Sequence, residues 1–259
     1  MRTFVLQQSA RIVGAGLLWV SAVSASEHEA LPVTDPDATQ LIADMGAFLA
    51  DLEQFAFDAS IRYDAPSSVT GLVEIQEQHE VVVSRPRSLK VSLLGEGGLR
   101  VAIIHDELLY LVDPATQRYF AIEAPGSLEE SLEFLITSVG VPVPNADFLY
   151  DDPARALLGD VIASDYLGVV PLDGAPAHHL VFAQEGLSWQ LWIDAATHPV
   201  PRRFVMTYGD LPGKPRFSAD LHWDLNPVPF GRAAFAVPGR DALTRVDAPE
   251  DIGAVGRGR

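Results

Sequence analysis

The sequence contains no cysteine among its 259 residues. This absence excludes disulfides, thiolate metal sites, a cysteine nucleophile and an acylated lipoprotein N-terminus. Positive charge is also scarce, since 18 Lys and Arg stand against 35 Asp and Glu, for a formal net charge of −17 at pH 7. Nucleic-acid binding and electrostatic docking on an anionic membrane both need clustered basic residues, so neither is expected.

The first 25 residues have little charge and the pattern of a signal peptide. Arg2 and Arg11 are the only charged residues before Glu27, and the apolar run 12–23 is too short to span a bilayer. Val23 and Ala25 flank a serine at a plausible signal-peptidase site, which predicts cleavage after Ala25, with an uncleaved anchor as the alternative. An exported chain without cysteine fits a bacterial periplasm, with no stable membrane insertion after cleavage.

The remaining composition predicts one turn-rich β domain. Hydrophobic residues make up 48% of the chain, and 19 prolines and 20 glycines are spread evenly along it. We expect a polar leader over 26–34 and a single domain over 35–237. The segment 238–259 is rich in Pro, Gly and charge and is predicted to be a disordered tail.

Three helices are predicted from capping residues and apolar spacing. Asp35-Pro36 is a typical N-cap and first helical residue, and apolar residues follow at helical spacing. Ser127 and Asp152-Pro153 begin two further helices in an insert over about 125–160. Acidic residues in the first turn favour the helix after Ser127. We interpret Glu129, Glu130 and Glu133 as a solvated helix face rather than a metal site, because no histidine is placed to help.

The rest of the domain alternates like β-strands. Apolar residues at Phe57, Ala59 and Ile61 alternate with polar ones, and Asp113-Pro114 and Asp173-Gly174 are strong turn signals. Ten or eleven short strands in an antiparallel meander are expected. The stretch 81–122 is apolar on both strand faces and must be covered on both sides, either by protein or by an apolar ligand.

No motif in the sequence carries recognisable catalytic chemistry. There is no phosphate-binding loop, no Gly-x-Ser-x-Gly elbow and no His-Glu-x-x-His helix, so we predict no catalytic residue, no metal and no cofactor. His178 and His179 are adjacent, and adjacent residues of a regular strand point to opposite faces. An enzyme would require His179 to converge with His222 or Asp194.

Several motifs resemble known exported proteins. The segment 84–91, with Arg85-Pro86, is similar to the Arg-Pro signature of the LolA family of lipoprotein carriers, and 105–117, with Asp113-Pro114, is similar to a second LolA segment. A fuller resemblance over most of 36–227 is to the DUF2092 family of exported bacterial proteins. It rests on the Arg-Pro, Asp-Pro and His-His-Leu elements and on Trp189-Gln190-Leu191-Trp192 with the Pro201-Arg202-Arg203 that follows.

The resemblance implies an α+β, LolA-like fold, a half-open antiparallel barrel wrapped around helices, with an apolar cavity for acyl chains. It implies a non-catalytic periplasmic protein that sequesters the acyl chain of a lipid or lipoprotein; the alternative is an envelope-stress sensor that binds an envelope protein through 125–160. Arg85 matches the family's functional arginine, so Arg85→Leu is expected to leave folding nearly intact and to alter ligand retention. The candidate ligand-binding residues are Arg85, Leu93, Ile103, Tyr110, Phe120, Leu191, Phe204 and Met206. The sequence does not decide which face of the sheet lines the cavity.

Overall fold

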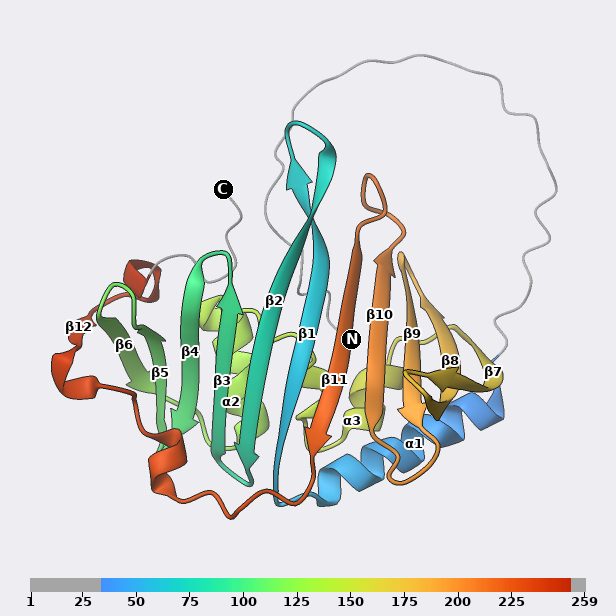
Figure 1. Cartoon of the computed structure of the whole chain (residues 1–259), viewed down its shortest axis with the longest axis horizontal. Coiled ribbons are helices and arrows are strands. Elements are labelled where there is room, and N and C mark those ends of the chain that lie inside the picture. Colours follow the sequence, from blue (N-terminus) through green and yellow to red (C-terminus); the bar gives the residue numbers. More distant parts are fainter. Residues whose placement is uncertain (1–33, 253–259) are drawn as a thin grey trace.

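The computed structural model describes residues 34–252, and these form one twelve-stranded sheet with helices packed on it (Figure 1). The predicted signal peptide over 1–25 and most of the polar leader lie outside the described residues. The strands are β1 (Gln54–Ser67), β2 (Gly71–Ser84), β3 (Ser88–Gly95), β4 (Gly98–His105), β5 (Leu108–Asp113), β6 (Arg118–Glu123), β7 (Ala163–Leu172), β8 (Ala175–Gln184), β9 (Leu187–Asp194), β10 (Pro201–Tyr208), β11 (Arg216–Asp224) and β12 (Thr244–Val246).

The sheet is open, with β12 and β7 at its two edges. The strand order is β12-β6-β5-β4-β3-β2-β1-β11-β10-β9-β8-β7, and every neighbouring pair is antiparallel except β12 and β6, which are parallel. The long connection between β6 and β7 sends the chain to the opposite end of the sheet, and β11 then returns to pair with β1. Two meanders are thus joined edge to edge at the β1–β11 pair.

The helices begin where the sequence predicts them to begin. They are α1 (Pro36–Asp51), α2 (Leu128–Phe134), which continues into the π-helical turn η1 (Leu135–Val139), and α3 (Pro153–Leu158), with the short 3-10 turns η2 (Ala146–Phe148), η3 (Arg232–Phe235), η4 (Arg240–Ala242) and η5 (Pro249–Ile252). The carboxylate of Asp35 accepts the N–H groups of Asp37 and Ala38, and Ser127 forms a reciprocal capping box with Glu130. These side chains satisfy helix N–H groups that have no partner within the helix.

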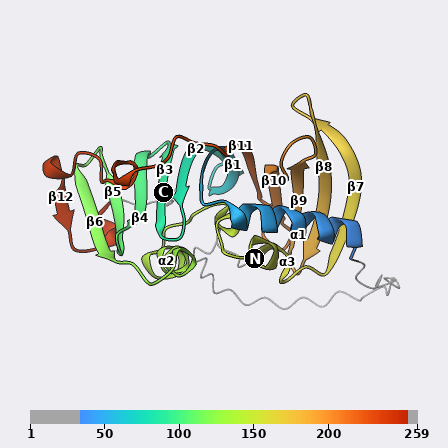
Figure 2. The ribbon, with the colours of Figure 1, turned by 90° about the horizontal axis from the view of Figure 1, so that it is seen from below.

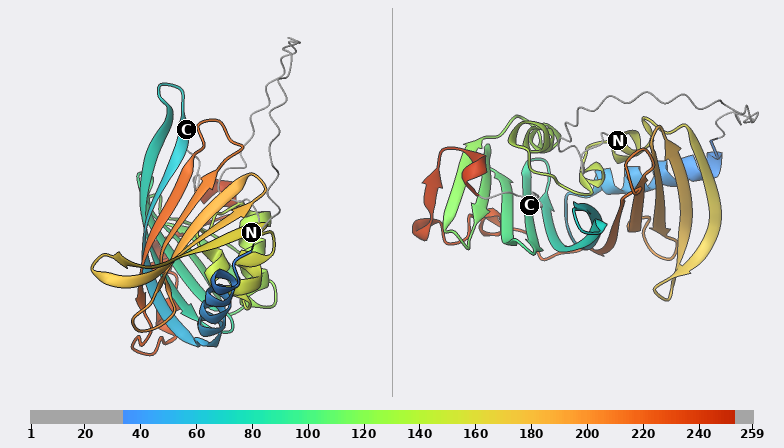
Figure 3. Two further views of the ribbon diagram at one scale, coloured as in Figure 1. Left: turned by 90° about the vertical axis from the view of Figure 1, so that its right-hand side faces the viewer. Right: turned by 90° about the horizontal axis from the view of Figure 1, so that it is seen from above.

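All three α-helices lie on one side of the curved sheet. Figures 2 and 3 show the sheet arching over α1, α2 and α3. The main core fills the space between them, and it joins Ile42, Met45 and Leu49 of α1 to alternating strand residues such as Phe57, Ala59 and Ile61. The predicted strand alternation is therefore confirmed for β1, with its apolar side chains facing the helices.

The C-terminal segment packs on the opposite face of β4 to β6. Phe235 packs against Ile103 and Tyr110 in a second apolar cluster, and the Arg240 guanidinium lies 5.5 Å from the centre of the Tyr110 ring. The two-sided apolar strands β4 and β5 are therefore covered on both faces by protein. Ile103 and Tyr110, expected to line a cavity, face this segment and lie away from the helices.

The tail predicted to be disordered from Pro238 is ordered through Ile252. Its residues Thr244–Val246 pair with β6, and the side chain of Ile252 is fully buried in the main core on the helix side of the sheet. The prediction of disorder was wrong because it rested on the overall composition of the segment. The few apolar side chains of the segment are buried against the edge of the sheet. Residues 253–259 lie outside the described residues.

The fold class is confirmed as α+β with an open, half-barrel antiparallel sheet around helices. The described residues contain twelve strands rather than ten or eleven, because the short β12 adds to the predicted set. No helix in residues 34–252 has the length and apolar character needed to cross a membrane.

Candidate functional site

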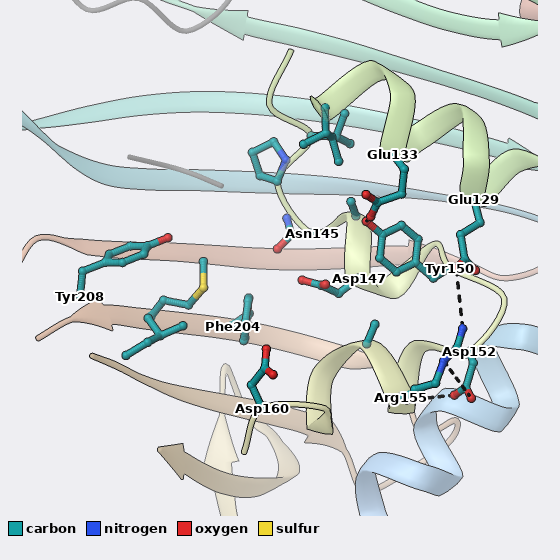
Figure 4. A pocket seen from close by; sticks show the side chains of 17 residues that line it. Glu129, Glu133, Asn145, Asp147, Tyr150, Asp152, Arg155, Asp160, Phe204 and Tyr208 are labelled. Carbon is teal, nitrogen blue, oxygen red and sulfur yellow. Dashed lines mark hydrogen bonds and ion pairs between the residues drawn. The ribbon is translucent and has the colours of Figure 1, made fainter. Parts of the chain in front are cut away.

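A pocket of about 320 Å³ lies between the helical segment 128–160 and strands β9 and β10 (Figure 4). Its apolar wall is formed by Phe204 and Met206 of β10, Leu187 of β9, and Ile136 and Val143 from the helical segment. Phe204 is fixed by edge-on contacts with Phe148 and Trp189, at ring-centre distances of 5.7 and 5.8 Å. This part of the helix–sheet interface is therefore apolar but not filled by side chains.

The opposite wall of the pocket is strongly acidic. Glu129, Glu133, Asp147, Asp152 and Asp160 line it, with a single guanidinium from Arg155. Arg155 already pairs with two of these groups, since its nitrogens lie 3.8 Å from Glu129 and 3.9 Å from Asp152. The sequence-based interpretation of Glu129 and Glu133 as a solvated helix face is thus wrong, because α2 turns both side chains toward the pocket.

Two tyrosines stand among the carboxylates. The Tyr150 hydroxyl donates a 2.6 Å hydrogen bond to Glu133, and burial together with this carboxylate raises the pKa of Tyr150 well above its usual range. Burial and the charge of Asp147 raise the pKa of Tyr208 to about 12. Both phenols therefore keep their protons at physiological pH and serve as hydrogen-bond donors inside the pocket.

Asp147 lies at the base of the acidic wall. Burial, reinforced by the charge of Glu133, raises the pKa of its carboxyl to about 6. This carboxyl is consequently ionised at neutral pH in a position where ionisation costs free energy.

We expect Asp147→Asn to raise the free energy of unfolding more at pH 7.5 than at pH 4.5. The gain at pH 7.5 should exceed the gain at pH 4.5 by about 2 kcal/mol. The folded pKa exceeds the unfolded one, so the native state binds more protons between the two values and loses stability as pH rises toward 6. Glu133, Tyr150 and Tyr208 are the same in the original protein and in the variant, so the comparison isolates the carboxyl of Asp147.

Urea unfolding at both pH values measures the effect. The exposed Asp58→Asn serves as control, and equal stability differences at both pH values for Asp147→Asn would contradict the prediction.

Asn145 contributes a buried amide to the same pocket. Its side chain is 6% exposed, and neither the amide oxygen nor the amide nitrogen has a hydrogen-bond partner within the structure. Its backbone lies in the left-handed region, at φ 66°, which asparagine tolerates better than most residues. Buried amides are nearly always paired, so this one is available to a group that enters the pocket.

The loop that joins η2 to α3 is held from outside by Arg85. The Arg85 guanidinium donates to the carbonyl oxygens of Leu149 and Tyr150 at 3.1 and 3.3 Å and pairs with Asp151 at 3.3 Å. Its side chain is 12% exposed and lies 6.0 Å from the Phe55 ring centre. Arg85 thus ties the end of β2 to the loop and does not line the pocket.

The pocket includes only part of the predicted ligand-binding set. Phe204 and Met206 line it. Leu93 lies beside Ile252 in a narrow crevice at β3, and Phe120 and Leu191 are buried in the main core. Ile103 and Tyr110 lie on the other face of the sheet, and Arg85 binds the loop.

The remaining pocket residues were missed by sequence reasoning. Tyr208 follows Phe204 and Met206 at the same two-residue spacing, and that signal was sufficient to place it on the same strand face. No sequence signal distinguishes Asn145 and Asp147, because their position depends on how the helical segment packs on β10. His178 contacts the Tyr166 hydroxyl and His179 contacts Gln190, so each has its own partner. Within residues 34–252, no three His, Asp or Glu side chains are arranged to hold a metal ion.

A family model described as "Predicted periplasmic protein (DUF2092)" matches residues 38–244. The chain belongs to the DUF2092 family. The family predicted from the sequence motifs is thereby confirmed, and so is the periplasmic location. The comparison with curated proteins gave no match.

The solved structures that match this DUF2092 protein share little sequence with it. The lipoprotein LppX of Mycobacterium tuberculosis is 15% identical, with a TM-score of 0.46, over 76% of this chain and 99% of LppX. An uncharacterised protein of Thermus thermophilus has the same identity and TM-score over 81% and 99% of the two chains. A LolA superfamily protein of Nitrosomonas europaea is 14% identical, with a TM-score of 0.39, over 77% and 97%.

Proposed function

We propose that this periplasmic protein binds the alkyl or acyl chain of a lipid or lipoprotein in the pocket between β9, β10 and the helical segment. The observation that carries the proposal is the apolar wall of Leu187, Phe204 and Met206 facing about 320 Å³ of unfilled space. This volume lies at the small end of the range for ligand pockets, about 300 to 1,000 Å³.

Sequestration of a chain needs no catalytic group. Each methylene buried against apolar side chains contributes about 0.8 kcal/mol, so a single chain of moderate length can bind with useful affinity. The helical segment then acts as a cover over the sheet, and Arg85 fixes the loop that forms part of it. The alternative function, binding of an envelope protein through 125–160, stays a prediction of the family resemblance.

Filling the pocket tests the proposal. We expect Ala156→Trp to weaken binding of a neutral ten-carbon alcohol at least tenfold, because Ala156 of α3 lines the pocket and an indole occupies the space of the chain. Displacement of a neutral fluorescent naphthylamine probe measures the affinity, and native mass spectrometry counts the bound chains.

The matched control is Ala47→Trp, which adds the same side chain on the exposed face of α1. It is expected to bind as the original protein does. Unchanged binding by a folded Ala156→Trp would place the chain elsewhere, and an original protein that binds no chain would refute the proposed function.

A further inference from the structure

The acidic wall of the pocket has a consequence for the head group of any chain that enters it. An anionic head, such as a carboxylate or a phosphate, would be placed among Glu133, Asp147 and Asp160. The one cation of the wall, Arg155, is already paired with Glu129 and Asp152. Like charges in a partly buried site repel strongly, so the pocket disfavours anionic ligands.

The unpaired amide of Asn145 is an independent sign of a polar ligand group. It is buried, it has no partner at either amide atom, and it lines the same pocket as Asp147. Figure 4 shows Asn145 and Asp147 around one space, with Phe204 and Tyr208 on its strand side. An amide oxygen and a carboxylate side by side accept hydrogen bonds from a group that has several N–H donors and a positive charge.

We propose that the pocket selects chains that carry a cationic amine at the end held by Asn145 and Asp147. This inference rests on the proposed function, since the apolar half of the ligand occupies the wall formed by Phe204 and Met206. A primary ammonium has three donors, which match the amide oxygen of Asn145 and the carboxylates around it. The ligand class is therefore an amphipathic alkylamine, whether a free amine or an amine-bearing lipid.

Three ligands of equal chain length test the inference on the purified protein. Decylammonium, decanol and decanoate compete with the neutral naphthylamine probe at pH 7.5 and low salt, below the concentrations at which they form micelles. Decylammonium is expected to displace the probe at a concentration at least tenfold lower than decanoate does. This preference should shrink at 0.5 M sodium chloride, because added salt screens charge interactions. A short-chain form of an amine-bearing lipid, tested in the same displacement assay, distinguishes a lipid amine from a free alkylamine as the ligand.

Variants locate the preference in the pocket. Asp147→Asn is expected to reduce the ratio between decylammonium and decanoate affinity at least threefold, and Glu133→Gln provides a second, independent test. Asp58→Asn, which removes an exposed carboxylate of β1, is the control and should leave the ratio unchanged.

The outcomes separate the two proposals. Decanoate that binds as tightly as decylammonium, or a ratio that neither pocket variant changes, overturns the selection of amines and leaves chain binding in place. Displacement of the probe by none of the three ligands overturns both the amine preference and the proposed function.

Discussion

Arg85→Leu is expected to lower the free energy of unfolding by about 3 kcal/mol. The guanidinium is 12% exposed, and it donates to two main-chain carbonyls, of Leu149 and Tyr150, that have to be paired when buried. Leucine supplies no donor and also removes the cation–π contact with Phe55. Hydrogen bonds from a charged donor contribute more than neutral ones, and loss of the donor leaves its acceptors unsatisfied. Urea unfolding at neutral pH measures the change.

Arg87 provides a matched control two residues away. Its side chain is 46% exposed and pairs at 3.3 Å with Glu107, which is 74% exposed. Exposed ion pairs contribute little, so Arg87→Leu is expected to change stability by less than about 0.5 kcal/mol. An Arg85→Leu protein as stable as the original, with weakened retention of a bound chain, would contradict the structural role. It would instead favour the role implied by the resemblance to LolA, a cation at the mouth of the cavity.

Gly46→Leu is the second change with a large expected effect, a loss of about 3 kcal/mol of stability. Gly46 is a buried position of α1 where the helix crosses the first turn of α3. A Cβ atom there would lie 2.8 Å from both the Cβ and the main-chain nitrogen of Ala154. Since part of this clash is with backbone, the two helices have to separate. Because α3 forms part of the pocket wall, we also expect binding of decanol to weaken at least tenfold.

The control for Gly46→Leu is Ala47→Leu, which adds a leucine side chain on the exposed face of the same helix. Helix propensity favours Gly46→Leu and slightly disfavours Ala47→Leu, so a larger loss of stability in Gly46→Leu has to come from the clash. Ala154→Gly combined with Gly46→Leu should recover part of the lost stability, because it removes one of the two contacts. A Gly46→Leu protein that unfolds at the same urea concentration as Ala47→Leu would show that α1 and α3 are not packed this closely.

Local features of the fold were predictable because they depend on near neighbours in the sequence. The N-cap bonds of Asp35 and Ser127 join residues no more than three positions apart. The Asp173-Gly174 turn has positive φ at both residues, as its sequence indicates. Strand alternation in β1 likewise follows from the two-residue period of side chains along a strand.

The candidate site was predictable only in part, for a reason visible in β4, β5 and β10. Ile103 of β4 and Tyr110 of β5 belong to strands that are apolar on both faces, so their sequence carries no signal for which face meets the helices. The C-terminal segment decides it, because Phe235 and Arg240 cover that face from more than 100 residues away. Phe204 and Met206 line the pocket, and the same two-residue spacing extends to Tyr208.

The sequence by itself determined the family, the start of each α-helix and the open antiparallel sheet, since short-range patterns and motifs carry all of these. Only the tertiary structure decided that Arg85 holds a loop, that protein covers both faces of β4 and β5, and that acidic residues of α2 and the loop before α3 face Phe204 across a pocket. These facts depend on how the sheet curves and on which distant segment packs against it. No short stretch of sequence encodes that packing.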